Sequence, residues 1–235
     1  MATLNPPKKI SRRHELRQDQ VVTGYARAWD FIDKNRTLVW GIVGAIVLLV
    51  VLAVAYVFYQ ENQEAEAQGA LAAPIRLYEQ DNYREALDGA GGAMGFLAIA
   101  DEYGGTDAGN LAHFYAADAL FNLGEYDQAL EHFEDFDKEE NYLGASALAG
   151  EAAVYENRGE YERAGQLYQR AASQFESELT SPQYLLSAGR AFEEAANYAA
   201  AQAAYETLRD DFSDAPAAQD VDAYIARVAA LSADA

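Results

Sequence analysis

The chain has 235 residues, no cysteine, 17 Lys and Arg and 38 Asp and Glu, which give a net charge of −21. The absence of cysteine excludes a disulfide framework and a thiolate metal site. Residues 1–37 carry a charge of +4, whereas residues 60–235 carry −25, and a segment this acidic repels nucleic acid and anionic lipid. The acidic surface either attracts basic partners or only keeps the segment solvated, as in proteins of salt-loving organisms, and the composition favours the second interpretation.

The basic segment 1–37 contains apolar residues at helical spacing among polar ones: Val22, Tyr25, Trp29 and Ile32. This stripe fits an interfacial helix on the inner leaflet or a helix that docks onto a membrane partner. It fits a loosely ordered basic tail equally well.

Residues 38–59 form an uncharged run of 22 residues. As a helix the run measures about 33 Å, against a hydrocarbon core of about 30 Å. It is too long for the apolar core of a signal peptide, although Ala65–Ala67 resembles a cleavage site. We therefore predict an uncleaved transmembrane helix. The eight Lys and Arg before it predict a cytoplasmic N-terminus and a domain 60–235 on the other side of the inner (cell) membrane. The linker 60–69 is rich in Glu, Gln and Ala and is expected to continue the helix.

The domain 60–235 contains an internal repeat. Residues 122–129 (NLGEYDQA) and 157–164 (NRGEYERA) share five identities at a spacing of 35. The Tyr-x-x-Ala element of these segments also begins at Tyr83 and Tyr198. Each copy predicts a first helix that ends in a left-handed turn at Gly or Asn, and a second helix whose small Ala allows close packing. An aromatic residue follows that Ala by four positions in three copies (Phe133, Tyr168 and Tyr205). A helix–turn–helix period near 34 residues is typical of tetratricopeptide repeats.

The sequence resembles tetratricopeptide repeats over Leu111–Ser213, with a degenerate first repeat at Gly69–Ala90. The order of anchor, linker and acidic, tyrosine-rich repeats is similar to membrane-anchored periplasmic tetratricopeptide proteins of bacteria related to the ancillary subunit of the Sec translocon. It also resembles the cell-division coordinator that shares this repeat domain. The fold class implied is all-α, a single transmembrane helix followed by a solenoid of about four repeats.

Some segments depart from a regular repeat. Gly89–Gly95 is expected to interrupt the first repeat as a loop, with a helix over 96–103 after it. Pro74 is expected to bend or start the first helix of that repeat. A last helix over 215–232 is predicted to close the stack with an apolar stripe formed by Val221, Tyr224, Ile225, Val228 and Leu231.

No motif in the sequence indicates catalysis. The glycine run lacks the Lys-Ser/Thr and the preceding strand of a phosphate loop. His14, His113 and His132 do not have metal-ligand spacing. No serine lies in a G-x-S-x-G elbow. The sequence therefore predicts a protein that is not an enzyme and has no cofactor, no metal and no small-molecule substrate.

In tetratricopeptide proteins, the first helices of the repeats line a concave groove. The groove positions that the resemblance implies are Leu111, Phe114, Asp118, Phe121 and Asn122 in the second repeat, Ala149, Ala153, Glu156 and Asn157 in the third, and Leu186, Arg190 and Glu193 in the fourth.

Two features of these positions bear on the ligand. Asn122 and Asn157 match a position where Asn often holds the backbone of a ligand. Phe114 and Ala149 replace the lysines that clamp a terminal carboxylate in chaperone adaptors, which argues against such a ligand. Phe114 and Phe121 either anchor an apolar segment of a client or pack against a neighbouring helix.

The resulting prediction is a protein-binding module, tethered to the membrane, with a chaperone-like or scaffolding role for secreted or envelope proteins near the Sec translocon. The alternative is an envelope-assembly or cell-division scaffold that binds one folded partner. The expected partners are client polypeptides or subunits of the envelope and translocon, and not nucleic acid.

Overall fold

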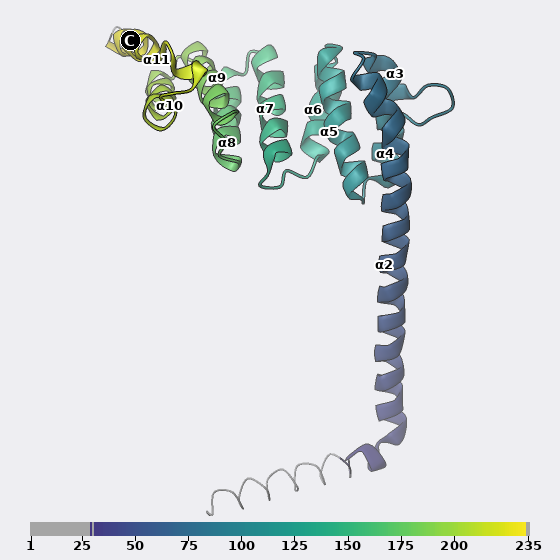
Figure 1. The fold of residues 1–235 in the computed structure, drawn as a ribbon. Helices are drawn as coiled ribbons and strands as arrows, with labels where there is room; N and C mark the ends of the chain where they lie inside the picture. The colour runs from purple at the N-terminus through teal and green to yellow at the C-terminus, as the bar shows by residue number, and fades with distance from the viewer. Residues whose placement is uncertain (1–28, 30, 234–235) are drawn as a thin grey trace, which may run out of the picture. The chain divides into compact units, whose positions relative to one another are not determined.

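The computed structural model describes residue 29 and residues 31–233. Val22 and Tyr25, two members of the apolar stripe expected near the N-terminus, lie outside the described residues. The regular elements of the described part are all helices, joined by turns and loops, and it contains no strand (Figure 1). The chain divides into two units, residues 1–59 and residues 60–235.

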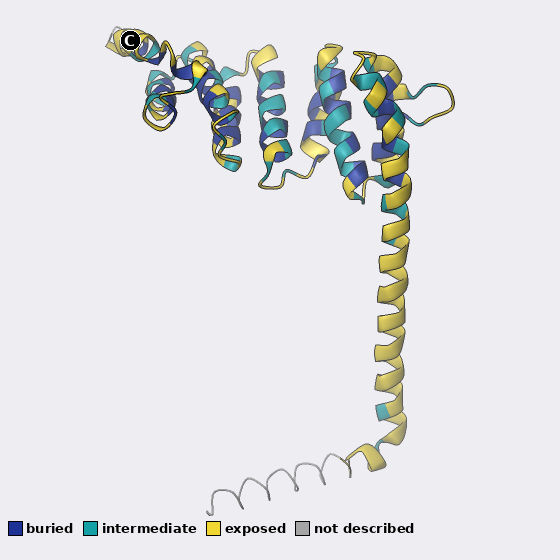
Figure 2. Cartoon of the chain, in the orientation of Figure 1, coloured by how far each residue is buried: buried dark blue, intermediate teal, exposed yellow. Residues whose placement is uncertain are grey.

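Helix α2 (Arg36–Tyr78) contains the uncharged run. All side chains from residue 40 to residue 59 are exposed (Figure 2). Within the described residues, α2 is the one helix that is long and apolar enough to cross a membrane. Residues 60–69 are helical, as their composition predicts. Pro74 lies inside α2 with its side chain buried, so it does not start the helix.

The second unit alternates first and second helices. The first helices are α5 (Asp107–Asn122), α7 (Tyr142–Asn157) and α9 (Ser181–Glu194), with the last turns of α2 serving the first repeat. The second helices are α3 (Tyr83–Asp88), α6 (Tyr126–Asp135), α8 (Tyr161–Gln174) and α10 (Tyr198–Asp211). Each second helix begins at the tyrosine of a Tyr-x-x-Ala element, as the repeat predicts. Helix α4 (Phe96–Tyr103) follows the loop 89–95 over the residues expected for it.

The core is built from small residues and aromatic rings that face each other. The four alanines of the Tyr-x-x-Ala elements are 0% exposed. A Cβ added to Gly189 would lie 2.2 Å from Cε1 of Tyr205, and one added to Gly150 would lie 2.2 Å from Cζ of Phe133. Gly165 faces the ring of Phe192 in the same way. Glycine at these positions therefore leaves the space that the rings occupy.

The turns between first and second helices require a left-handed residue. Gly124 and Gly159 supply it with φ near +77°, but in the first and fourth repeats it is Asp81 (φ 59°) and Ala196 (φ 56°). In the fourth repeat the left-handed residue is thus Ala196, directly before Asn197, and not a Gly or Asn as the repeat pattern predicts. The Asn197 side chain instead accepts a hydrogen bond from the backbone N–H of Ala200 at 3.2 Å, so it caps the start of α10.

The end of the chain differs from the helix expected over 215–232. Residues Pro216–Ala218 form a separate 3-10 turn (η1), and α11 runs from Val221 to Ala233. Val221 and Val228 of the predicted stripe are buried, and Tyr224 and Ile225 are half-buried. Leu231 is 41% exposed, so the contact of the stripe with the core ends one turn before it.

Ala196 offers a test of the turn geometry. An L-residue at positive φ is strained by about 1 kcal/mol, which glycine relieves in part. Ala196→Gly is expected to raise the free energy of unfolding by about 0.5–1 kcal/mol. Chemical denaturation of the full chain measures the change. As the matched control, Gly159→Ala introduces the same strain one repeat earlier and is expected to lower stability by about 1 kcal/mol. Equal stability of Ala196→Gly and the wild type would contradict the strain.

Candidate protein-binding groove

Polar side chains connect some of the neighbouring first helices. The Tyr78 hydroxyl of α2 donates a hydrogen bond to the Asp118 carboxylate of α5. The hydroxyls of Ser146 on α7 and Tyr184 on α9 lie 3.3 Å apart. Helix α11 continues the row, because its residue Arg227 donates to Glu193 of α9 from Nε at 2.9 Å and from Nη2 at 2.5 Å. The closing helix therefore occupies the place of a first helix of a fifth repeat.

Carboxylates on two of the first helices also accept hydrogen bonds from tyrosines of the second helices. Glu156 accepts from the Tyr168 hydroxyl at 3.0 Å, and Glu193 accepts from the Tyr205 hydroxyl at 2.9 Å. Burial, together with the neighbouring carboxylate, raises the pKa of both tyrosines well above the usual value. The two tyrosines therefore stay protonated and act as donors. In the second repeat the equivalent positions are Phe121 and Phe133.

The predicted groove residues separate into exposed and packed ones. Asn122, Glu156, Asn157 and Arg190 are exposed. The half-buried residues are Leu111, Phe114, Asp118, Phe121, Ala149, Ala153 and Glu193. Leu186 is 8% exposed and belongs to the core, so it is not available to a ligand, contrary to its place among the predicted groove positions. The structure does not bring the twelve residues into one pocket.

Phe114 and Phe121 both have aromatic partners within the chain. The ring centroid of Phe114 lies 5.5 Å from that of Phe136 and 6.4 Å from that of Phe133. The Phe121 ring lies 5.3 Å from that of Tyr126. These contacts agree with the alternative in which both phenylalanines pack against neighbouring segments.

The two asparagines make equivalent contacts. Nδ2 of Asn122 donates to the carbonyl oxygen of Asp118 at 2.8 Å, and Nδ2 of Asn157 donates to that of Ala153 at 2.8 Å. The amide oxygens of both side chains accept no hydrogen bond within the described residues, so both are available as acceptors for a ligand. A backbone N–H of a bound peptide is the group that such an oxygen accepts.

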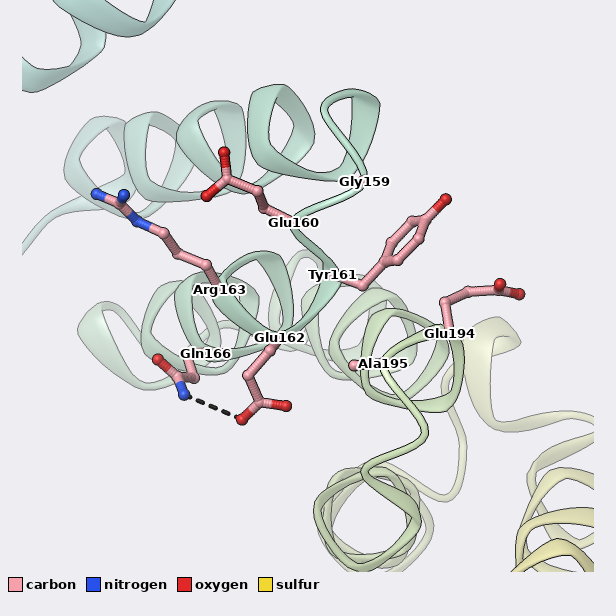
Figure 3. Close-up of a pocket in the computed structure, with 8 residues that line it drawn as sticks. All are labelled: Gly159, Glu160, Tyr161, Glu162, Arg163, Gln166, Glu194 and Ala195. Carbon is pink, nitrogen blue, oxygen red and sulfur yellow. Dashed lines mark hydrogen bonds between the residues drawn. The ribbon is translucent and has the colours of Figure 1, made fainter.

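A cavity lies at the turn between the third and fourth repeats. It has a volume of about 610 Å³ and is lined by the turn Gly159–Arg163, Gln166 and the end of α9 at Glu194 and Ala195 (Figure 3). A smaller cavity of about 310 Å³ lies at the equivalent turn one repeat earlier, lined by Gly124–Gln128 and Arg158. The sequence pattern identified these turns but gave no signal that they enclose space.

A histidine pair is a second feature that the sequence did not reveal. Nδ1 of His113 on α5 and Nδ1 of His132 on α6 lie 3.0 Å apart, so one ring donates a hydrogen bond to the other. Burial lowers the pKa of both imidazoles, and His113 lowers that of His132 further, while Asp135 opposes the change. Within residue 29 and residues 31–233, no group of three or more His, Cys, Asp or Glu side chains is arranged to hold a metal ion.

Comparison with known proteins establishes the fold. No family model matches the sequence, and no curated protein matches it. A crystal structure of a putative kinesin light chain from Podosopora anserina, with nearly identical TPR-like repeats, matches with a TM-score of 0.55 at 12% identity. The match covers 73% of this chain and 89% of that one. The chain therefore contains a TPR-like helical repeat.

The histidine pair predicts a pH dependence of stability. A histidine whose pKa is lower in the folded state binds its proton more readily when unfolded, so stability is fully present above the unfolded pKa of about 6.5 and falls as the pH drops below it. Denaturation of the full chain between pH 7.5 and pH 5 is expected to show this loss. The variant His113→Gln/His132→Gln is expected to lose less stability over the same interval. Identical pH profiles for the two proteins would show that the pair does not titrate differently on folding.

Proposed function

We propose that this protein is a single-pass inner-membrane protein whose repeat domain lies in the periplasm and binds other proteins, with a chaperone-like or scaffolding role near the Sec translocon. The observation that carries the proposal is the row of first helices in a TPR-like array, because these helices present exposed polar side chains. The same chain also contains an exposed apolar helix. Asn122, Glu156, Asn157 and Arg190 are the exposed members of that row among the predicted positions.

The apolar helix supports the membrane tether. Ile46, Leu49 and Leu52 are 55%, 65% and 56% exposed, and every other side chain from residue 40 to residue 59 is exposed as well. Exposing this run to water is unfavourable by about 25 cal/mol for each Å² of apolar surface. A lipid bilayer removes that surface from water, and the length of the run matches the hydrocarbon core.

Charge supports the orientation. Residues 1–37 contain eight Lys and Arg, whereas the 30 residues after the apolar run contain only Arg76 and Arg84. Positive residues near a membrane helix tend to remain on the cytoplasmic side. The proximity to the Sec translocon rests on the resemblance in the order of anchor, linker and repeats.

Site-specific crosslinking tests the groove. A photoreactive residue at Asn157 or Arg190 is expected to capture other proteins, because both side chains are exposed on first helices. The same residue at Ala203, which is exposed on the second helix α10, is the matched control and is expected to capture little. Many heterogeneous nascent chains would support a chaperone-like role, and one stoichiometric band would support a scaffold. Capture from Ala203 equal to that from Asn157 and Arg190, in protein shown to be folded, would remove the groove proposal.

Protease accessibility tests the orientation. Protease added to spheroplasts is expected to digest residues 60–235 and to leave residues 1–37 intact, because the positive segment stays in the cytoplasm. Epitope tags at the two ends report each fragment, and a cytoplasmic protein serves as the control for intact membranes. Protection of the repeats together with an intact control would reverse the proposed topology.

A further inference from the structure

We propose that the cavity between the third and fourth repeats (Gly159–Arg163, Gln166, Glu194 and Ala195) binds an arginine side chain presented by a protein partner. This inference rests on the proposed protein-binding function and assigns a chemical class to part of the partner. It places the contact at the turn between these two repeats.

The first argument compares two equivalent junctions in the chain. Between the second and third repeats, Arg158 at the end of α7 forms an ion pair with Asp127 at the start of α6. In the next junction the repeat register places Glu162 where Asp127 stands and Ala195 where Arg158 stands. The acid is therefore retained and the cation is missing.

The backbone at the two positions is the same. Arg158 has φ −82° and ψ −6°, and Ala195 has φ −76° and ψ −3°. A methyl group stands here in place of the arginine side chain, and the cavity is about 610 Å³ where the one beside Arg158 is about 310 Å³. A guanidinium from another chain can thus occupy the volume that Arg158 occupies one repeat earlier.

The carboxylates around the cavity lack a cation. Glu162 accepts from two neutral amides, Nε2 of Gln166 at 3.1 Å and Nδ2 of Asn197 at 3.1 Å. Glu160 and Glu194 form no ion pair within the part of the chain that the structure describes. The last turn of α9 also carries no basic residue, so the negative end of the helix dipole adds to the same field.

The nearest cation is directed elsewhere. Arg163 lines the cavity, but its Cζ lies 3.8 Å from the ring centroid of Tyr155 and its Nη2 lies 3.9 Å from Glu134. Figure 3 shows its side chain pointing away from Glu162, while Glu162 and Gln166 lie together. The internal arginine is thus held by the preceding helices and does not neutralise the site.

Arginine fits the site better than lysine. Its planar guanidinium pairs with carboxylates through two donors and stacks on aromatic rings. Tyr161 provides a ring in the wall of the cavity, and the chain itself stacks Arg163 on Tyr155. The net charge of −25 on residues 60–235 attracts a basic partner toward this surface.

Peptide binding to the full chain in non-ionic detergent tests the inference. The probe is a rhodamine-labelled (Gly-Arg)3 peptide, and its citrulline counterpart has the same shape without the charge. Fluorescence anisotropy is expected to show tighter binding of the arginine peptide. Ala195→Arg supplies the missing cation from within the chain and is expected to weaken binding about two- to fivefold, in keeping with an exposed ion pair. Ala229→Arg, on the exposed face of α11, is the matched control for added charge and is expected to weaken binding less.

Exchanging the residues at positions 158 and 195 distinguishes the effect of a cation inside the cavity from the effect of the net charge of the chain. Arg158→Ala removes the cation that pairs with Asp127 and is expected to add a second site. The double variant Arg158→Ala/Ala195→Arg keeps the wild-type charge, supplies a cation to Glu162 and removes the one at Asp127, so it is expected to bind more tightly than Ala195→Arg alone. Should Ala195→Arg lose its circular dichroism spectrum, Glu162→Gln replaces it with the same expected loss.

Equal weakening by Ala195→Arg and Ala229→Arg, or equal binding of the arginine and citrulline peptides, would overturn the inference. These outcomes are distinct from failure of the proposed function. Crosslinking from Asn157 and Arg190 reports protein binding in the groove independently of the cavity.

Discussion

Helices in the repeat unit approach each other closely because a small residue on one faces an aromatic ring on the next. Gly150, Gly165 and Gly189 face Phe133, Phe192 and Tyr205, and even one added methyl group would overlap these rings. Interiors pack at the density of organic crystals, so a ring inserted at such a position fixes both the separation and the register of the two helices. The repeat of this contact along the chain is what turns separate helix pairs into a continuous array.

The ring that fills the core also organises the polar edge of the first helices. Tyr205 is 0% exposed, yet its hydroxyl reaches Glu193, which in turn accepts from Arg227 of the closing helix. A single residue thus joins the apolar core, the fourth repeat and α11. The cost is that Glu193 has its hydrogen-bonding capacity satisfied within the chain. Surface for a partner is therefore left at exposed neighbours such as Arg190 and at the turns.

The local pattern of the sequence predicted the helices well and their long-range contacts poorly. The Tyr-x-x-Ala elements marked the first residue of each second helix, since the corner tyrosine and the small Ala are local requirements. The histidine pair was missed because it joins positions 19 residues apart on two helices, and their rotation about each other is set by packing. The groove positions taken from the resemblance lie on the first helices α5, α7 and α9, but the side chain of Leu186 lies in the core. A fixed offset along a helix does not specify which face a neighbouring helix covers.

Equivalent positions in successive repeats share a backbone conformation but differ in side chain, and the repeat pattern does not predict these differences. Gly159 and Ala196 make the same left-handed turn, and Arg158 and Ala195 share the same backbone conformation just before it. Backbone geometry is therefore conserved along the array, while the charge at each junction changes. At one junction Asp127 forms an ion pair with Arg158. At the next junction Glu162 accepts hydrogen bonds from two neutral amides and has no cationic partner there. Because stacking requires only the small residues and the rings, the turn residues are free to differ from one junction to the next.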